Sequence, residues 1–253
     1  MNNKKYPDDF ISKIINEDCL FVLPQIPNKS VKLVITSPPY NMGGKSLGYQ
    51  PRSKISDKHY DIYDDDLDEK EYTDFLIKCI ELCLLKADYV FWNIQFLKST
   101  KNTIIDIQNR FRNNLKDIFI WHKQAISQII NKDTNQPVRM ATGWEYVFIF
   151  GDDNSKSFDN VNFPKNNYVP NIKTWHKTES FQEHHAIFPI ELPYYFIQYF
   201  SKPNDIILDP FIGVGTTAAA AKLLKRNFIG IDVSSNYCEI ARKRVLDTPE
   251  TLF

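Results

Sequence analysis

The sequence lacks the features that mark membrane, secreted and fibrous proteins. Its longest apolar runs, such as those around 89–92 and 205–208, are far shorter than the ~20 residues of a membrane-spanning helix. No apolar stretch follows Lys4 and Lys5, so we expect no signal peptide. Because only 8 glycines are present and no segment recurs at a fixed period, collagen-like and repeat architectures are also excluded.

Cysteine and excess charge are scarce as well. The four cysteines show no ligand spacing with histidines, so we expect neither zinc nor disulfides, and a cytoplasmic location. Cys79 and Cys83 lie four residues apart in a helical pattern, which predicts two small buried residues on one face. The 31 Lys+Arg balance the 31 Asp+Glu, so any contact with nucleic acid must come from local basic patches.

What is present is the alternation of strands and helices typical of an α/β protein. We expect one domain, 1–253, with a mostly parallel sheet covered by helices on both faces. The predicted strands are 13–16, 31–36, 87–94, 118–121, 145–150, 206–209 and 228–232. The predicted helices are 100–115, 188–200, 217–224, 236–245 and one that follows 68–71, with Phe75, Ile77, Ile80, Leu84 and Leu85 as its apolar face. Residues 41–63 and 151–183 have no regular period, which is typical of long functional loops.

The first chemical motif, Asp-Pro-Phe-Ile-Gly-Val-Gly-Thr-Thr at 209–217, lies between a predicted strand and a predicted helix. Gly213 and Gly215 permit a close approach of a ligand to the backbone, and the following helix start presents unpaired N–H groups. Asp232 ends the next strand, where a carboxylate can accept hydrogen bonds from two ribose hydroxyls. Since a third glycine and a Gly-Lys-Ser/Thr are missing, an adenosyl ligand without a phosphate chain is favoured over a nucleotide; a plain tight turn is the structural alternative.

The second motif, Thr-Ser-Pro-Pro-Tyr-Asn at 36–41, directly follows another predicted strand. Pro38 and Pro39 fix φ, so the carbonyls of Ser37 and Pro38 are held stiffly. Together with Ser37 Oγ they offer acceptors to the hydrogens of a planar exocyclic amine, while Tyr40 stacks on a base that has left the duplex. A Pro-Pro turn that merely ends a strand is the alternative.

The two motifs, in this order, resemble those of the β-class amino-group DNA methyltransferases of restriction-modification systems. Members of that family transfer a methyl group from S-adenosylmethionine to cytosine N4 or adenine N6, and their target-recognition region lies between the two motifs. The same order is found here in 37–40, 151–183 and 211–215. The resemblance covers nearly the whole chain and implies a Rossmann-like, circularly permuted S-adenosylmethionine-dependent methyltransferase fold, in which the two distant motifs converge.

By this resemblance, specific residues acquire roles. The catalytic residues are Ser37, Pro38, Pro39 and Tyr40. The residues implied to bind the cofactor are Asp18, Phe188, Pro189, Asp209, Phe211, Gly213, Gly215, Thr216 and Asp232. Asp18 takes the position that binds the adenine amine, with Glu17 where the family usually has glycine, and Phe188 and Pro189 close over the methionine end. No metal is implied, and for His184 and His185 both a ligand role and a polar helix entry remain open.

The resemblance also bears on the substrate. Ser-Pro-Pro-Tyr is associated more with cytosine N4, so we favour cytosine; adenine N6 is the alternative. The implied partner is double-stranded DNA, with 41–63 as a mobile loop on the DNA side, 151–183 as the target-recognition region, and the basic residues of 41–60 and 98–123 near phosphates. Candidates for reading base edges are Asn166, Asn167, Asn171, Lys173, Trp175 and His176. Trp92 and Trp121 either wall the site or belong to the core.

Two further partners stay open, a second copy of the chain and a cognate restriction endonuclease, and no membrane partner is expected. Outside the enzyme class, the alternative is a non-catalytic DNA-binding subunit. The presence of both intact motifs disfavours it, because a protein without turnover has no need for both. Methylation of RNA or protein is a third alternative.

Overall fold

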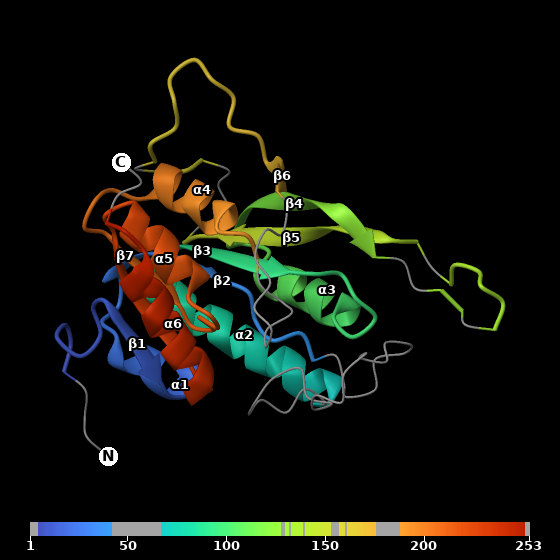
Figure 1. Ribbon diagram of the computed structural model, residues 1–253, viewed down its shortest axis with the longest axis horizontal. Helices are drawn as coiled ribbons and strands as arrows, with labels where there is room; N and C mark the ends of the chain where they lie inside the picture. Colours follow the sequence, from blue (N-terminus) through green and yellow to red (C-terminus); the bar gives the residue numbers. More distant parts are fainter. Residues whose placement is uncertain are drawn as a thin grey trace.

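The chain folds around one eight-stranded sheet with helices on both of its faces (Figure 1). A computed structural model describes residues 5–41, 67–127, 130–131, 133–138, 140–152, 157–159, 161–175 and 188–250. The strands lie in the order β1-β8-β7-β2-β3-β5-β4-β6. None of the described helices is long and apolar enough to cross a membrane.

Five adjacent strands run parallel and form one half of the sheet. In spatial order they are β1 (Lys13–Asn16), β8 (Asn227–Asp232), β7 (Ile206–Asp209), β2 (Val31–Thr36) and β3 (Ala87–Ile94). Their runs of Val, Ile and Leu suit strands that are covered on both faces. Because all five run in the same direction, their carboxyl ends meet at one edge of the sheet, where ligands bind in folds of this type.

The other half of the sheet contains a reversed strand and an addition that the sequence did not predict. β5 (Thr142–Phe150) is antiparallel to β3 and to β4 (Leu115–Ser127), and the hairpin of β4 and β5 extends beyond the helices in Figure 1. β6 (Ile172–Trp175) adds a parallel edge strand to β4. Part of 151–183 is therefore regular structure, contrary to prediction. Four residues with only partly buried side chains are too short to show a periodicity.

The helices divide between the two faces of the sheet. One face is covered by α1 (Cys19–Val22), α2 (Glu69–Lys86) and α3 (Lys101–Arg110), with the short 3-10 turn η1 (Leu23–Gln25) after α1. The other face is covered by α4 (Glu191–Phe200), α5 (Thr216–Leu223) and α6 (Ser235–Asp247). Alternate residues of one strand serve the two layers: in β2, Val34 packs toward α2, whereas Leu33 and Ile35 pack toward α4 and α5.

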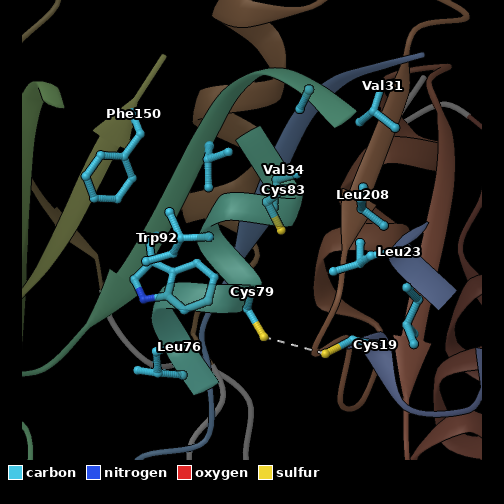
Figure 2. Close-up of a cluster of buried hydrophobic side chains, with 14 of the residues drawn as sticks. Cys19, Leu23, Val31, Val34, Leu76, Cys79, Cys83, Trp92, Phe150 and Leu208 are labelled. Carbon is cyan, nitrogen blue, oxygen red and sulfur yellow. Dashed lines mark hydrogen bonds between the residues drawn. The ribbon is translucent and has the colours of Figure 1, made fainter. Parts of the chain in front are cut away.

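The core under α2 contains the two cysteines that the sequence placed on one buried face. Cys79 and Cys83 are fully buried, and the Sγ atom of Cys79 lies 3.8 Å from that of Cys19 (Figure 2). Burial raises the pKa of the Cys79 and Cys83 thiols well above the usual range. They are therefore protonated packing residues, as the helical spacing predicted.

The buried face of α2 and the limits of two helices differ from the predictions. Leu85 is half exposed, and the fully buried spine is Tyr72, Leu76, Cys79, Ile80 and Cys83, in which cysteine and tyrosine take positions expected for leucine. The predicted helix 100–115 ends at Arg110, because β4 begins at Leu115. The predicted helix 188–200 begins only at Glu191, after Pro189.

Candidate active site

The two motifs meet at the carboxyl edge of the sheet because they follow neighbouring parallel strands. β2 and β7 pair in the register Val34 to Leu208, so Thr36 and Asp209 end their strands side by side. The Thr36 hydroxyl donates a hydrogen bond to Asp209 Oδ1 at 2.6 Å. This contact joins residues 173 positions apart in the chain, and it confirms the predicted convergence of the motifs.

The Asp209 carboxylate is the buried centre of this junction. Besides Thr36, it accepts hydrogen bonds from the Thr217 hydroxyl at 2.6 Å and from the Phe211 N–H at 3.1 Å. Burial raises the pKa of Asp209 to about 6, although its three hydrogen bonds oppose the shift. The side chain is 2% exposed and points into the protein, so its observed contacts are structural, in contrast to the predicted place at the entrance of the cofactor site.

The glycine turn after β7 is held against the next strand. Gly213 and Gly215 have φ of 49° and 86°, in the left-handed region that favours glycine. The Gly213 N–H donates to Asp232 Oδ2 at 3.0 Å, and Gly215 precedes α5. A Cβ on Gly215 would lie 2.9 Å from the Ala241 Cα, so the glycine also lets α5 approach α6 closely.

Asp232 and Asp18 lie at the same edge as the turn. Asp232 ends β8 and accepts from the Ser234 N–H through Oδ1, while burial raises its pKa. Asn16, at the end of β1, pairs with Asp232, and Asp18 follows as an exposed residue whose Oδ1 caps α1. Among the contacts of the described residues, the Gly213 N–H bonds to one Asp232 oxygen and the Ser234 N–H to the other, and a carboxylate oxygen has a second lone pair that suits a ribose hydroxyl.

The remaining residues predicted to bind the cofactor lie around this edge. Phe211 is partly buried and presents its ring to Trp92, with the centroids 6.1 Å apart. Thr216 begins α5, and its hydroxyl accepts from Arg244 of α6. Phe188 and Pro189 are buried before α4 on the opposite face of the sheet from Phe211.

Residues 37–40, which follow β2 and are called the diproline corner below, are held in place by α2. The Tyr72 hydroxyl donates to the Pro39 carbonyl at 2.7 Å. Within the described part of the chain, no donor bonds to the carbonyls of Ser37 and Pro38. The carbonyls of Ser37 and Pro38 therefore remain acceptors, as predicted, while the next carbonyl, that of Pro39, anchors the corner to α2.

A carboxylate that sequence reasoning missed completes the corner. Tyr40 OH donates to Glu145 Oε2 at 3.0 Å and lies 3.1 Å from Ser37 Oγ, while Glu145 Oε1 pairs with Lys123. Glu145 is 4% exposed. Its one sequence signal was a charged residue at the start of the otherwise apolar predicted strand 145–150.

The residues predicted either to read bases or to belong to the core differ in their burial. Trp92 and Trp121 are buried in the two cores, which favours the core interpretation. Asn166 and Asn167 are exposed, whereas Asn171 bonds to the Ile118 carbonyl and Trp175 stacks on Phe119. His176, His184, His185 and all of 41–63 except Asn41 lie outside the described residues.

Two of the cations expected near phosphates are engaged inside the protein. Lys116 is buried and donates to the Ser157 carbonyl, and Lys123 pairs with the buried Glu145. Arg110 pairs with Glu81 at the surface. The charged ends of Lys116 and Lys123 are thus bound within the protein, and the predicted basic patch over 98–123 must rest on its other cations.

Asn41, the last residue of the motif at 36–41, is bonded to the chain just before α2. Its side chain donates to the Leu67 carbonyl and accepts from the Leu67 N–H, both at 2.8 Å. The last residue of the corner motif is thus joined to the residue before the Asp68 cap of α2. Asn41 and Leu67, which flank residues 42–66 in the sequence, therefore lie in contact beside the site.

A model of the DNA methylase family, whose members methylate N6 and N4 amino groups, matches residues 31–243 of this sequence. The chain belongs to this family. Type II methyltransferase M.HinfI of Haemophilus influenzae is 30% identical over 278 residues, which span 96% of this chain and 70% of that protein. The resemblance to the amino-group DNA methyltransferases is confirmed, and the chain is a DNA methyltransferase.

Solved structures agree with the architecture of this methylase. PvuII DNA methyltransferase (cytosine-N4-specific) has a TM-score of 0.68 at 20% identity, covering 94% of this chain and 88% of its own. The M1.HpyAVI complex with S-adenosylmethionine has a TM-score of 0.60 at 21% identity, covering 92% and 98%. The predicted Rossmann-like methyltransferase fold is confirmed, and S-adenosylmethionine is the cofactor that goes with this family and fold.

We predict that Asp209→Ala lowers the free energy of unfolding by roughly 2–5 kcal/mol, because three buried donors lose their acceptor. Asp209→Asn keeps the shape and one acceptor oxygen, so it should cost much less. Urea unfolding of both variants measures the difference. Equal stabilities of the two variants would contradict the junction as the role of this carboxylate.

The raised pKa of Asp209 also predicts that the free energy of unfolding depends on pH. Because the pKa of Asp209 is raised to about 6 in the fold, its protonation stabilises the native state at low pH, and this contribution is lost as the pH rises through about 6. Between pH 5 and 7, wild type should lose on the order of 1 kcal/mol relative to Asp209→Asn. A constant difference between the two proteins would show that Asp209 does not titrate in this range.

Proposed function

We propose that this methylase transfers a methyl group from S-adenosylmethionine to the N4 amine of a cytosine in double-stranded DNA. The observation that carries the proposal is the junction of β2 and β7, where the Thr36 to Asp209 hydrogen bond joins the diproline corner to the glycine turn. Two groups can react only when both are held within a few ångströms. This junction supplies a fixed frame for a methyl donor on one side and an amine on the other.

On the donor side, the proposed contacts follow the edge of the sheet. Asp232 accepts from the ribose hydroxyls, Asp18 from the adenine amine, and Gly213 and Gly215 leave room for the adenosyl group. Phe211 and Thr216, with Phe188 and Pro189 from the other face, would line the methionine end. When bound, the cofactor supplies an electrophilic methyl group on a sulfonium. The chain supplies position and excludes water.

On the acceptor side, Ser37 Oγ and the Pro38 carbonyl would receive the two hydrogens of the amine. This orients the nitrogen lone pair, which is otherwise delocalised into the ring, toward the methyl group. The proposed stacking of Tyr40 on the base would need access to the Tyr40 ring, and that ring is buried in this structure. The stacking role therefore stays a prediction, and the contacts of the Tyr40 hydroxyl do not support it.

The base must leave the helix to reach this edge, so we also propose base flipping. In this proposal 1–253 acts as a single methyltransferase domain, and 151–183 and 41–63 contribute the DNA-facing parts. The similarity to a type II methyltransferase supports a role in a restriction-modification system. The cognate endonuclease and a second copy of the chain remain predictions.

The choice of cytosine over adenine rests on Ser37. A serine at this position is the variant associated with N4, and the solved structure with the highest TM-score quoted above is named as cytosine-N4-specific. The purified protein should be incubated with methyl-labelled cofactor and unmethylated duplex DNA, and the digested nucleosides identified by mass spectrometry. N4-methylcytosine supports the proposal, N6-methyladenine supports the adenine alternative, and label only in RNA or protein would refute both.

We predict that Ser37→Ala lowers kcat by about 10²- to 10³-fold, because one acceptor aimed at the reacting amine is lost. The affinity for the cofactor should stay within about twofold of wild type, since Ser37 lies on the acceptor side. Single-turnover methylation and calorimetry measure the two quantities. Ser30→Ala, whose hydroxyl bonds only to the Pro27 carbonyl among the described residues, is the matched control. An unchanged kcat in Ser37→Ala removes Ser37 from catalysis.

We predict that Asp232→Ala weakens cofactor binding by about 10- to 100-fold, because two hydrogen bonds to a charged acceptor are lost. Titration calorimetry with S-adenosylmethionine measures this directly. Asp106→Ala, an exposed aspartate of α3, serves as the control and should bind as wild type. Wild-type affinity in Asp232→Ala would refute the ribose assignment.

A further inference from the structure

A chain of four polar side chains leads from the diproline corner into the antiparallel half of the sheet. Ser37 Oγ lies 3.1 Å from Tyr40 OH, Tyr40 OH donates to Glu145 Oε2 at 3.0 Å, and Glu145 Oε1 pairs with Lys123. Glu145 begins the buried part of β5 and is paired in register with Trp121 of β4. Lys123, two residues further along β4, lies with its Nζ 5.1 Å from the Trp121 ring centroid.

The chemistry of these groups fixes the direction of each proton. A carboxylate can only accept, and a tyrosine hydroxyl has a single proton to give. Since that proton goes to Glu145, the bond between Ser37 and Tyr40 requires the serine to donate. Ser37 Oγ is then left with lone pairs alone on its remaining side. Toward a further partner it can then act only as an acceptor.

We propose that Glu145 is a positioning residue that makes Ser37 a hydrogen-bond acceptor for the target amine. The inference rests on the proposed function, because an amine presents donors and only an acceptor can hold them. If the Tyr40 proton turned toward Ser37 instead, the serine proton would be free to point toward the amine, where two donors would then face each other. Glu145 acts through Tyr40 and need not touch the DNA.

Lys123 stabilises the charged form of this arrangement by pairing with Glu145. A buried carboxylate is costly unless a cation is paired with it, so the acceptor for the Tyr40 proton depends on its cationic partner. The ammonium of Lys123, held between Glu145 and the face of Trp121, supplies the charge.

Glu145→Gln tests the proposal with an isosteric change. The amide has both a donor and an acceptor, so the direction of the Tyr40 proton is no longer enforced. We expect kcat to fall by about 100-fold, in the range for groups that orient catalysis, while the affinities for cofactor and duplex DNA stay within about twofold. Glu239→Gln, an exposed glutamate of α6, should match wild type. Wild-type kcat in Glu145→Gln overturns the proposal.

A double-mutant cycle separates positioning from a general structural role. Tyr40→Phe keeps the ring and removes the link, so adding Glu145→Gln to it should change kcat by less than about twofold. If the two effects multiply instead, Glu145 does not act through Tyr40, and the proposal is wrong. Circular dichroism and Tm establish that each variant is folded before kinetics.

Lys123→Met provides a second route that leaves Ser37, Tyr40 and Glu145 in place. Its kcat should fall in the wild-type background and should not fall further in Tyr40→Phe; a wild-type kcat contradicts the proposal. All these ratios are taken relative to an active wild type. A wild type that methylates no duplex DNA would refute the proposed function, whereas an active wild type with an unaffected Glu145→Gln would refute this inference alone.

Discussion

The structure depends on one buried carboxylate. Asp209 receives hydrogen bonds from the end of β2, from its own turn and from the first turn of α5, so the strand that presents the amine acceptors and the turn expected to face the cofactor are fixed to each other. Burying a charge is costly, and three donors offset that cost only when all are in place. The raised pKa of Asp209 reflects the part of the burial cost that the three hydrogen bonds do not offset. The relative position of the two halves of the site is thus built into the core and does not rely on the ligands.

The two halves of the sheet make different contributions. The parallel half gathers the ends of β1, β8, β7 and β2 at one edge, which gives the adenosyl side its carboxylates and glycines. In the other half, the reversed strand β5 supplies Glu145 to Tyr40, and its neighbour β4, which runs in the same direction as β3, supplies Lys123 to Glu145. The parallel half therefore carries both the cofactor residues and the amine acceptors after β2, while β4 and β5 add the side chains that contact Tyr40.

Local patterns in the sequence predicted the parallel half well and the long-range contacts poorly. The bounds of β1, β2, β3 and β7 agree with prediction, since each is a compact run of β-branched or apolar residues. The two motifs were recognisable because their chemistry is contained in a few consecutive residues. The Tyr40 to Glu145 bond spans 105 positions and β6 has only four residues, so neither leaves a periodic signal. Asp209 was assigned to the ligand because the sequence shows its neighbours in the chain and not the hydroxyl of Thr36.

The double hydrogen bond between Asn41 and Leu67 has a thermodynamic consequence for the chain length between them. Asn41 and Leu67 are joined at a single point, so the 25 residues between them in the sequence form a closed loop in the topological sense. The entropy of closing a loop grows only with the logarithm of its length. A change in the number of residues between Asn41 and Leu67 should therefore cost the fold little stability, although it would alter the part that is proposed to face the DNA.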